Sequence, residues 1–379
     1  MNILLLEPYF TGSHAAWAAG LKKYSRHRVT ILSLKGAYWK WRMHGGAVTL
    51  AHAFMKSDET PDLILAGDML DLTTFLALTR SRTHPIPVAL YFHENQLSYP
   101  WSPDDRDIAA KRDRHYGFIN YVSALAADRC YFNSAFHMDS FLTELRPFLK
   151  HFPDSNELHT IAQINEKSRV LPLGLDLRRF DRAEPFPGDE HGPLILWNHR
   201  WEYDKNPGAF FRLMFRLEKA GRPFRLALLG ENFSRRPEIF EEARGRLGGR
   251  IVQYGYAESF SEYARWLQTA DLLPVTSRHD FFGISVAEAA YCGVRPILPR
   301  RLSYPEIFPV SSFGSLYYSD EEALFQQTVL LLRQGADRGE TDRLRDRVSQ
   351  YDWQRMIVRY DDELADLAGK DITARGSGT

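Results

Sequence analysis

The sequence is poor in the features that mark several specialised protein classes. Its 379 residues include two cysteines, Cys130 and Cys292. Two are too few for a disulfide framework or a cysteine-rich zinc site, so both are expected to be buried thiols. No run of about 18 apolar residues occurs, which argues against a membrane-spanning helix. The first residues lack the basic segment of a signal peptide and predict a strand, so we expect a cytoplasmic protein.

Neither sign of charge is in excess. Lys+Arg and Asp+Glu are both 48, so the net charge is zero, whereas a protein that coats nucleic acid is strongly basic. Residues 1–182 hold a small positive excess and the remainder a negative one, which fits a solvated surface as well as an anionic partner. With 44% hydrophobic and 25% charged residues, the composition is that of a globular protein, and the length predicts two or three domains.

The apolar pattern predicts an α/β protein, because short apolar runs alternate with segments of helical periodicity. In the first half, the predicted strands are residues 3–8, 29–34, 63–66, 88–92 and 130–132, and the predicted helices are residues 14–24, 108–128 and 134–145. In the second half, the predicted strands are residues 194–198, 226–229, 251–254, 272–275 and 296–298. Helices are predicted there at residues 207–220 and 285–290, and residues 321–367 are predicted to be purely helical.

The two halves are separated by residues 182–193, which are rich in proline, glycine and charge. We therefore predict two Rossmann-like, doubly wound parallel-sheet domains facing across a cleft, with residues 1–182 and 194–350 joined by a linker at 183–193. A helix at 351–369 is expected to pack back on the N-terminal domain, and residues 370–379 are expected to be disordered. Ligands of open α/β sheets bind beyond the carboxyl ends of the strands, so site residues are expected directly after each strand.

A glycine-containing turn follows the first predicted strand. Gly12, Ser13 and His14 lead into a helix, where backbone N–H groups and the helix dipole favour an anion. The GxGxxG fingerprint is absent, which argues against a dehydrogenase. An ordinary tight turn is the alternative interpretation.

Four polar residues, His93, Glu94, Asn95 and Gln96, follow the fourth predicted strand. Polar side chains at the end of a buried strand need a ligand or a hydrogen-bonded network. The zinc motif HExxH is not formed, because Leu97 stands where its second histidine is required. A hydrogen-bonded loop without a ligand is the alternative.

Two cations, Arg200 and Lys205, follow the first strand of the second half. A helix is expected to begin at Pro207 with Asn206 as its cap. Cations beside a helix N-terminus suit a diphosphate, whereas a surface ion-pair cluster is the alternative.

Two carboxylates, Asp280 and Glu288, lie on either side of a turn at Gly283. Asp280 is expected in the loop and Glu288 in the following helix, so that both face one ligand. Carboxylates are natural acceptors for sugar and ribose hydroxyls. A helix-start acid and a solvated glutamate are the alternative.

These motifs together resemble those of the retaining family-4 glycosyltransferases. The resemblance is carried by residues 280–283, Glu288, Cys292-Gly293, Arg295-Pro296, Asn133-Ser134, residues 173–176 and the Arg200/Lys205 pair. It extends over nearly the whole chain and implies the GT-B fold. The sequence departs from the family at Asp280, where the family carries a glutamate, which is one methylene longer.

A narrower resemblance is to the tRNA-queuosine mannosyltransferases. It is carried by Glu7-Pro8-Tyr9, Gly12-Ser13-His14, residues 39–43, residues 91–96 and residues 303–309. This family implies transfer of mannose from GDP-mannose to the cyclopentene diol of queuosine in aspartate tRNA. It implies retention of the anomeric configuration and no metal requirement.

The resemblance also implies a role for each candidate residue. Arg200 and Lys205, with N–H groups near Gly12 and Ser13, would stabilise the diphosphate leaving group. Asp280 and N–H groups near Phe282, Gly283 and Ile284 would contact the mannose, Glu288 the ribose, and Gly255 and Tyr256 the guanine. His93 would lie beside the reacting sugar, and His14, Glu94, Asn95 and Gln96 would hold the acceptor.

The tRNA footprint is expected on the first domain. Trp39 and Trp41 are expected to stack on an unpaired base, next to Arg42. Further positive points are Lys22, Lys23, Arg26, Arg28, Lys40, Lys111, Arg112 and Arg114. Core tryptophans and solvated helix faces are the alternative.

Two other functions stay open at this point. A GT-B glycosyltransferase with a lipid or polysaccharide acceptor would be favoured by a basic amphipathic membrane-docking helix, and none stands out in the sequence. A non-catalytic RNA- or nucleotide-binding protein on a GT-B scaffold is the other, and Arg200, Lys205 and Glu288 argue against it. The residues do not distinguish GDP from UDP.

Overall fold

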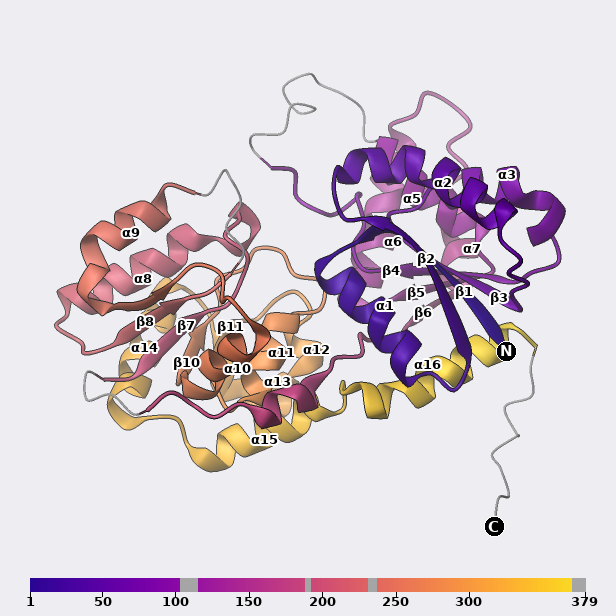
Figure 1. Cartoon of the computed structure of the whole chain (residues 1–379). Coiled ribbons are helices and arrows are strands. Elements are labelled where there is room, and N and C mark those ends of the chain that lie inside the picture. The colour runs from indigo at the N-terminus through magenta and orange to yellow at the C-terminus, as the bar shows by residue number, and fades with distance from the viewer. Residues whose placement is uncertain (103–114, 188–191, 231–236, 370–379) are drawn as a thin grey trace, which may run out of the picture. The chain divides into compact units, whose positions relative to one another are not determined.

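The structure is a computed structural model, and it describes residues 1–102, 115–187, 192–230 and 237–369. These residues form two compact units (Figure 1). One unit combines Met1–Leu175 with the C-terminal helix Trp353–Leu367, and the other is Asp176–Asp352. Each unit is built on a six-stranded parallel sheet, as the alternating pattern predicts.

The first sheet has the strand order β2-β1-β3-β4-β5-β6. Its strands are β1 (Asn2–Phe10), β2 (Arg28–Lys35), β3 (Leu63–Gly67), β4 (Val88–Phe92), β5 (Arg129–Phe132) and β6 (Ser168–Val170). The sequence predicts the first five because β1, β3, β4 and β5 are almost continuously apolar, as strands buried on both faces are. It does not predict β6, which has three residues with Arg169 exposed in the middle.

Helices surround this sheet, with α2, α3 and α5 contacting one another and α1 contacting α16 (Figure 1). They are α1 (Gly12–Tyr24), α2 (Trp39–Lys56), α3 (Leu72–Thr83), α5 (His115–Ala126), α6 (Ala135–Lys150), α7 (Thr160–Glu166) and α16 (Trp353–Leu367). The sequence does not predict α2, whose interior holds Gly45 and Gly46, two residues that weaken a helix. Of the predicted helix 108–128, residues 108–114 lie outside the described residues.

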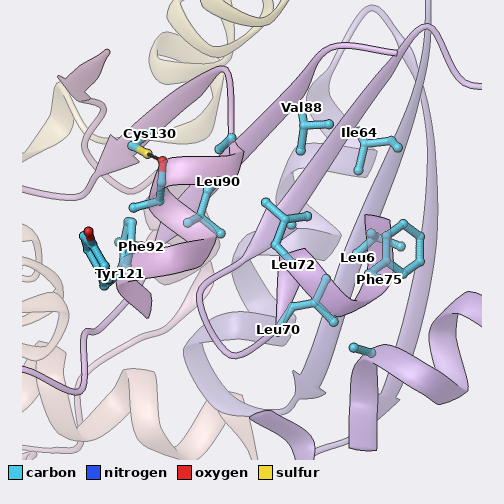
Figure 2. Close-up of a cluster of buried hydrophobic side chains, with 14 of the residues drawn as sticks. Leu6, Ile64, Leu70, Leu72, Phe75, Val88, Leu90, Phe92, Tyr121 and Cys130 are labelled. Carbon is cyan, nitrogen blue, oxygen red and sulfur yellow. Dashed lines mark hydrogen bonds between the residues drawn. The ribbon is translucent and has the colours of Figure 1, made fainter. Parts of the chain in front are cut away.

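A core of the first unit is formed by the sheet and the helices α2, α3, α5, α6 and α7. Figure 2 shows Ile64 and Leu90 from the strands close to Leu72 and Phe75 of α3. Cys130 belongs to this core, and its thiol donates to the carbonyl of Ala124 at 3.5 Å. Burial raises the pKa of this thiol to about 12, so Cys130 is a structural residue and not a nucleophile.

The C-terminal helix α16 is held to the first unit by buried polar contacts. The Tyr360 hydroxyl accepts from the Trp17 indole at 3.0 Å and donates to the Tyr91 hydroxyl at 2.9 Å. Trp353 lies directly over Gly20, where an added Cβ would be 2.0 Å from the indole nitrogen. Gly20 therefore lets α1 and α16 approach closely.

The second sheet has the order β12-β11-β10-β7-β8-β9. Its strands are β7 (Leu194–Trp197), β8 (Arg225–Leu228), β9 (Ile251–Tyr254), β10 (Leu272–Pro274), β11 (Arg295–Pro299) and β12 (Tyr317–Tyr318). The sequence predicts all but β12, which has two residues. Stacked and edge-on aromatic rings of Trp197, Trp201, Phe211 and Phe240 form the centre of its core.

The helices of the second unit are α8 (Pro207–Lys219), α9 (Ile239–Leu247), α10 (Phe260–Thr269), α11 (Ile284–Tyr291), α12 (Tyr304–Ile307), α13 (Val310–Phe313), α14 (Glu321–Gln334) and α15 (Arg338–Ser349). The helical C-terminal stretch is thus confirmed, with breaks before Arg338 and Trp353. Helix α8 begins at Pro207 as predicted. Asn206 is not a side-chain cap: it has a left-handed backbone (φ 53°), and its side chain makes no cap hydrogen bond.

The boundary between the units lies at Leu175–Asp176, earlier than the predicted linker 183–193. The 3₁₀ helix Leu177–Arg182 belongs to the second unit because Phe180 packs edge-on against Phe260, with ring centroids 5.0 Å apart. Phe186 also packs on the second unit, at 4.5 Å from Trp266. Residues 188–191 and the expected tail 370–379 lie outside the described residues.

None of the helices in the described part of the chain is both long and apolar enough to cross a membrane.

Candidate active site

The candidate residues gather where each sheet reverses its strand order. In the first unit this point lies between β1 and β3, and in the second between β7 and β10. The connections leave such neighbouring strands in opposite directions, which opens a crevice at their carboxyl ends. The candidate residues therefore form two clusters, one in each unit.

In the second unit, Lys205 is the centre of a buried charge cluster. Its ammonium lies 3.2 Å from a carboxylate oxygen of Asp204 and 3.6 Å from one of Asp280, and it donates to the carbonyl of His279 at 2.9 Å. The Lys205 residue is 9% exposed. Lys205 and Asp280, which the sequence places in separate motifs, are thus brought together, with Asp204 as a third member.

Asp280 is also held by two hydrogen-bond donors of the second unit. The backbone N–H of Gly283 donates to it at 2.8 Å, and the Tyr304 hydroxyl donates at 3.3 Å. Burial raises the pKa of Asp280, but the charge of Lys205 and the contacts with His199, His279 and Gly283 more than offset this and lower it. Asp280 is therefore a carboxylate at neutral pH, able to accept from a hydroxyl.

Two histidines beside this cluster are neutral. Burial, reinforced by the charge of Lys205, lowers the pKa of both His199 and His279 to about 4. The Nδ1 atom of His199 lies 2.8 Å from the Ser285 hydroxyl. The positive charge facing a ligand here therefore comes from lysine and arginine.

Glu288 lies in α11 and is held by residues that the sequence does not single out. The Tyr263 hydroxyl donates to it at 2.8 Å, and the Arg179 guanidinium lies 3.4 Å away. Burial raises the pKa of Glu288, although Arg179 and Tyr263 pull in the opposite direction. Asn198 donates to the Ser285 carbonyl at 2.9 Å and so ties the end of β7 to the start of α11.

The remaining candidates of the second unit differ in exposure. The Arg200 side chain is 44% exposed and lies 3.2 Å from Glu202. Gly255 has a left-handed backbone (φ 111°), and Tyr256 is 72% exposed. Phe282 is buried against Tyr351, so its ring packs in the unit and only its backbone can face a ligand. Ile284 is the first residue of α11.

In the first unit, Glu7 and His14 form a buried pair. An oxygen of Glu7 lies 3.2 Å from Nδ1 of His14, and the other accepts from the Tyr9 N–H at 2.9 Å. Burial lowers the pKa of His14, but Glu7, with Asp68 and Glu94, outweighs burial and raises it to about 9. His14, predicted as an acceptor residue, is thus a buried imidazolium at neutral pH.

His93 stacks on this pair as a neutral ring. Its centroid is 4.2 Å from that of His14 and 4.6 Å from Trp17. Burial, with the charges of His14 and His137, holds the pKa of His93 well below its usual range. Neither ring nitrogen has a hydrogen-bond partner in the described part of the chain, nor does Oδ2 of Asp68, whose other oxygen accepts from the His93 N–H at 2.8 Å.

The charge on His14 makes the stability of the protein depend on pH. Its pKa of about 9 in the folded state exceeds 6.5, the ordinary value, so its contribution is complete below pH 6.5 and is lost as the pH rises through about 9. Relative to the variant His14→Asn, the free energy of unfolding should fall by about 3 kcal/mol over this range. Urea unfolding of both proteins across that range measures the difference, and parallel pH curves would refute the buried ion pair.

The loop after β4 is mostly held by its own hydrogen bonds. Asn95 is fully buried, and its carbonyl oxygen accepts from the N–H groups of Leu97 and Ser98 at 3.1 and 2.9 Å. Gln96 donates to Glu94 at 2.9 Å. Asn95 therefore shapes the loop, while Glu94 and Gln96 are partly exposed and accessible to a ligand.

Among the residues that the structure describes, one group could offer ligands to a metal ion, although the sequence predicts no metal site. One ligand atom each of Glu7, His14 and His93 lies within 4.8 Å of the others. The Glu7–His14 hydrogen bond and the raised pKa of His14 favour a proton on His14, and not a metal ion, between these two side chains. The group is thus an ion pair beside a neutral imidazole, and metal independence stays a prediction.

Gly12 and Ser13 are exposed at the start of α1, and Gly12 has a left-handed backbone (φ 51°). No side chain caps this helix. Its first N–H groups therefore remain available to an anion, as the prediction of a diphosphate contact requires.

The two tryptophans predicted for tRNA binding differ in their exposure to solvent. Trp39 is half-buried, 5.1 Å from the ring of Tyr116, whereas Trp41 is 63% exposed. Arg42 donates to the carbonyl of Lys35 at 3.1 Å. Of the positive points, Arg26 pairs with Asp362 and Arg28 with Glu59, and Lys111, Arg112 and Arg114 lie outside the described residues.

Several residues of the two clusters are not predicted from the sequence. Asp68 follows β3, so the rule that site residues follow strands gives a signal for it. Gly230 follows β8 in the same way, and a Cβ there would lie 2.1 Å from the His199 carbonyl oxygen. Tyr263 and Arg179 give no such signal, because they reach Glu288 from a helix and a 3₁₀ segment distant in sequence.

Comparisons with known proteins agree with these features. A family model described as the N-terminal part of tRNA-queuosine alpha-mannosyltransferase matches residues 2–175. The tRNA-queuosine alpha-mannosyltransferase of Drosophila melanogaster is 36% identical over 316 residues, which are 81% of this chain and 82% of that protein. A GDP-mannose:cellobiosyl-diphosphopolyprenol alpha-mannosyltransferase of Xanthomonas oryzae is 26% identical over 206 residues, 53% of each chain.

Solved structures confirm the predicted fold class. Sucrose-phosphate synthase from Thermosynechococcus elongatus superposes with a TM-score of 0.70 at 14% identity, covering 97% of this chain and 99% of that one. A UDP-forming trehalose-phosphate synthase from Burkholderia xenovorans gives a TM-score of 0.65 at 13% identity, covering 98% and 99%. These are GT-B glycosyltransferases, and the fold of this chain is GT-B.

Proposed function

The chain belongs to the tRNA-queuosine alpha-mannosyltransferase family, and from this we propose that it transfers mannose from GDP-mannose to the cyclopentene diol of queuosine in aspartate tRNA. The observation that carries the proposal is the pairing of Lys205 with Asp280 in a chain of this family. We place the reaction in the cytoplasm, with tRNA as the acceptor.

The second unit is proposed to bind the donor. Breaking the bond between the mannose C1 and the phosphate oxygen leaves negative charge on the diphosphate. Arg200 is exposed and can turn from Glu202 to a phosphate, and Lys205 holds a second positive charge in a buried position. Preorganised cations of this kind stabilise the leaving group without reorganisation.

Two carboxylates are proposed to orient the sugar and the ribose. Asp280, fixed by Gly283 and Tyr304, would accept from a mannose hydroxyl, and Glu288 would accept from the ribose. In the free protein Tyr263 donates to Glu288. A ribose hydroxyl would therefore share or replace this contact.

The first unit is proposed to hold the acceptor. A queuosine hydroxyl would attack C1 from the face that the diphosphate leaves, and its proton would pass to the departing phosphate oxygen. Neutral His93 and the unpartnered oxygen of Asp68 are the polar groups available to orient this hydroxyl. We propose that no divalent ion is needed, because Arg200 and Lys205 supply the positive charge.

The test is transfer of radiolabelled mannose from GDP-mannose to purified tRNA. We expect labelling of queuosine-containing aspartate tRNA, and none of the same tRNA from cells grown without queuine. Equal labelling of both tRNAs would exclude queuosine as the acceptor. Labelling from UDP-sugars but not from GDP-mannose would overturn the donor assignment.

The same assay tests the predicted metal independence. Pre-treatment with EDTA should leave the rate unchanged. If EDTA abolishes transfer and Zn²⁺ or Mg²⁺ restores it, the proposal of metal-free transfer is wrong, and Glu7, His14 and His93 become the first residues to replace.

A further inference from the structure

The start of helix α2 presents two aromatic side chains to solvent. Tyr38 is 81% exposed and Trp41 is 63% exposed. Two large aromatic side chains exposed within four residues of each other make this turn a candidate binding surface. Of the two, Trp41 is predicted from the sequence as an RNA-binding residue and Tyr38 is not.

The Trp41 ring is held flat on the helix by a glycine one turn later. A Cβ added at Gly45 would lie 2.4 Å from Cζ2 of Trp41, so a larger residue there would displace the indole from this position. A glycine inside a helix costs about 1 kcal/mol relative to alanine. This arrangement fixes one face of the indole against α2 and leaves ring surface open to solvent.

Tyr38 is held in a conformation that tyrosine seldom adopts. Its backbone is left-handed (φ 55°, ψ 54°), and its carbonyl accepts from the N–H groups of Trp41 and Arg42 at 2.8 and 3.1 Å. The first turn of α2 therefore fixes the backbone that carries both rings. Strain of this kind is retained in proteins mainly where it places a functional group.

The sequence that flanks these two residues carries charge of one sign. Between Glu7 and Asp58 the sequence contains no acidic residue and eight lysines and arginines. Three of these, Lys35, Lys40 and Arg42, lie within four residues of Tyr38 or Trp41. The Lys40 ammonium lies 5.4 Å from the Trp101 ring centroid and 5.5 Å from that of Trp39. Lys35 is the last residue of β2, and the Arg42 guanidinium donates to its carbonyl.

We propose that Tyr38 and Trp41 form a stacking platform for unpaired bases of the RNA acceptor, with Lys35 and Arg42 placed for the flanking phosphates. The identity of the acceptor as RNA rests on the proposed function. Single-stranded RNA fits this surface because bases stack on aromatic rings while the backbone needs cations. The half-buried Trp39 belongs to the packing beneath the platform and not to the platform itself.

The experiment measures binding and does not depend on catalysis. Fluorescein-labelled, unmodified aspartate tRNA transcript is titrated with the full chain and followed by anisotropy. We expect Trp41→Ala to weaken binding about tenfold and Tyr38→Ala by several-fold, as stacking contacts do on truncation. Trp41→Phe, which keeps a ring, should stay within about threefold of the wild type.

Two variants separate stacking from damage to the fold. Gly45→Ala keeps Trp41 and favours the helix, but it removes the space for the ring, so weaker RNA binding without a lower melting temperature supports the platform. Phe152→Ala removes another exposed aromatic side chain of the first unit, 39% exposed, and should bind like the wild type.

The outcomes distinguish the platform from its alternatives. Wild-type affinity in both Trp41→Ala and Tyr38→Ala would overturn it. Binding of phosphatidylserine vesicles in place of tRNA, lost in Trp41→Ala, would also overturn it, because the surface would then face a membrane. If tRNA binding requires Trp41 while no mannose is transferred to any tRNA, the platform stands and the proposed function fails.

Discussion

Replacing Arg200 with alanine is expected to lower kcat/KM for mannose transfer by about 100- to 1000-fold. The guanidinium is 44% exposed and lies 3.2 Å from Glu202, and we expect it to exchange this exposed ion pair for a phosphate. An exposed ion pair contributes little to stability, and the melting temperature should therefore stay within a few degrees of the wild type. Transfer at varied GDP-mannose concentrations gives the measurement.

The matched control for this variant is Arg212→Ala. Arg212 is similarly exposed and pairs with Glu321 from the outer surface of α8, so its removal takes away the same charge without a phosphate contact. Its kcat/KM should remain within about twofold of the wild type. If Arg200→Ala behaved like Arg212→Ala, Arg200 would be a surface ion-pair residue, which is the alternative that the sequence left open.

The strands and the residues that follow them could be predicted because burial on both faces leaves a strong local pattern. Leu63–Gly67 and Val88–Phe92 are buried at every position, so they appear in the sequence as short apolar runs. Site residues that follow the strands, such as His93 after β4 and Arg200 after β7, could be predicted for the same reason. Helix α2 carries no such pattern, because Gly45 and Gly46 serve close packing and not helix propensity.

Contacts made across the fold could not be predicted from local pattern. Tyr263 reaches Glu288 from 25 residues away, and Asp204 shares Lys205 with Asp280 only because β7 and β10 are neighbours in the sheet. The different exposure of Trp39 and Trp41 could not be predicted for the same reason. Both are tryptophans at the start of one helix, and only their surroundings in the folded protein make one packed and the other exposed.

Replacing Lys205 with methionine is expected to abolish measurable transfer and to lower the free energy of unfolding by about 3–5 kcal/mol. Methionine keeps the length of the side chain but leaves the buried carboxylates of Asp204 and Asp280 without their shared cation. An uncompensated buried charge is far more destabilising than the loss of an exposed pair. Urea unfolding and the mannose-transfer assay measure the two effects separately.

The double variant Asp204→Asn with Lys205→Met separates the two roles of the lysine. It removes one of the two buried carboxylates that have lost their cation, so a substantial part of the lost stability should return. Transfer should not return, because the diphosphate still lacks its buried cation. The exposed residue Lys219, at the end of α8, is the control, and Lys219→Ala should change the stability by less than about 0.5 kcal/mol. If the double variant recovered transfer together with stability, Lys205 would act only by neutralising Asp204 and not by binding the diphosphate.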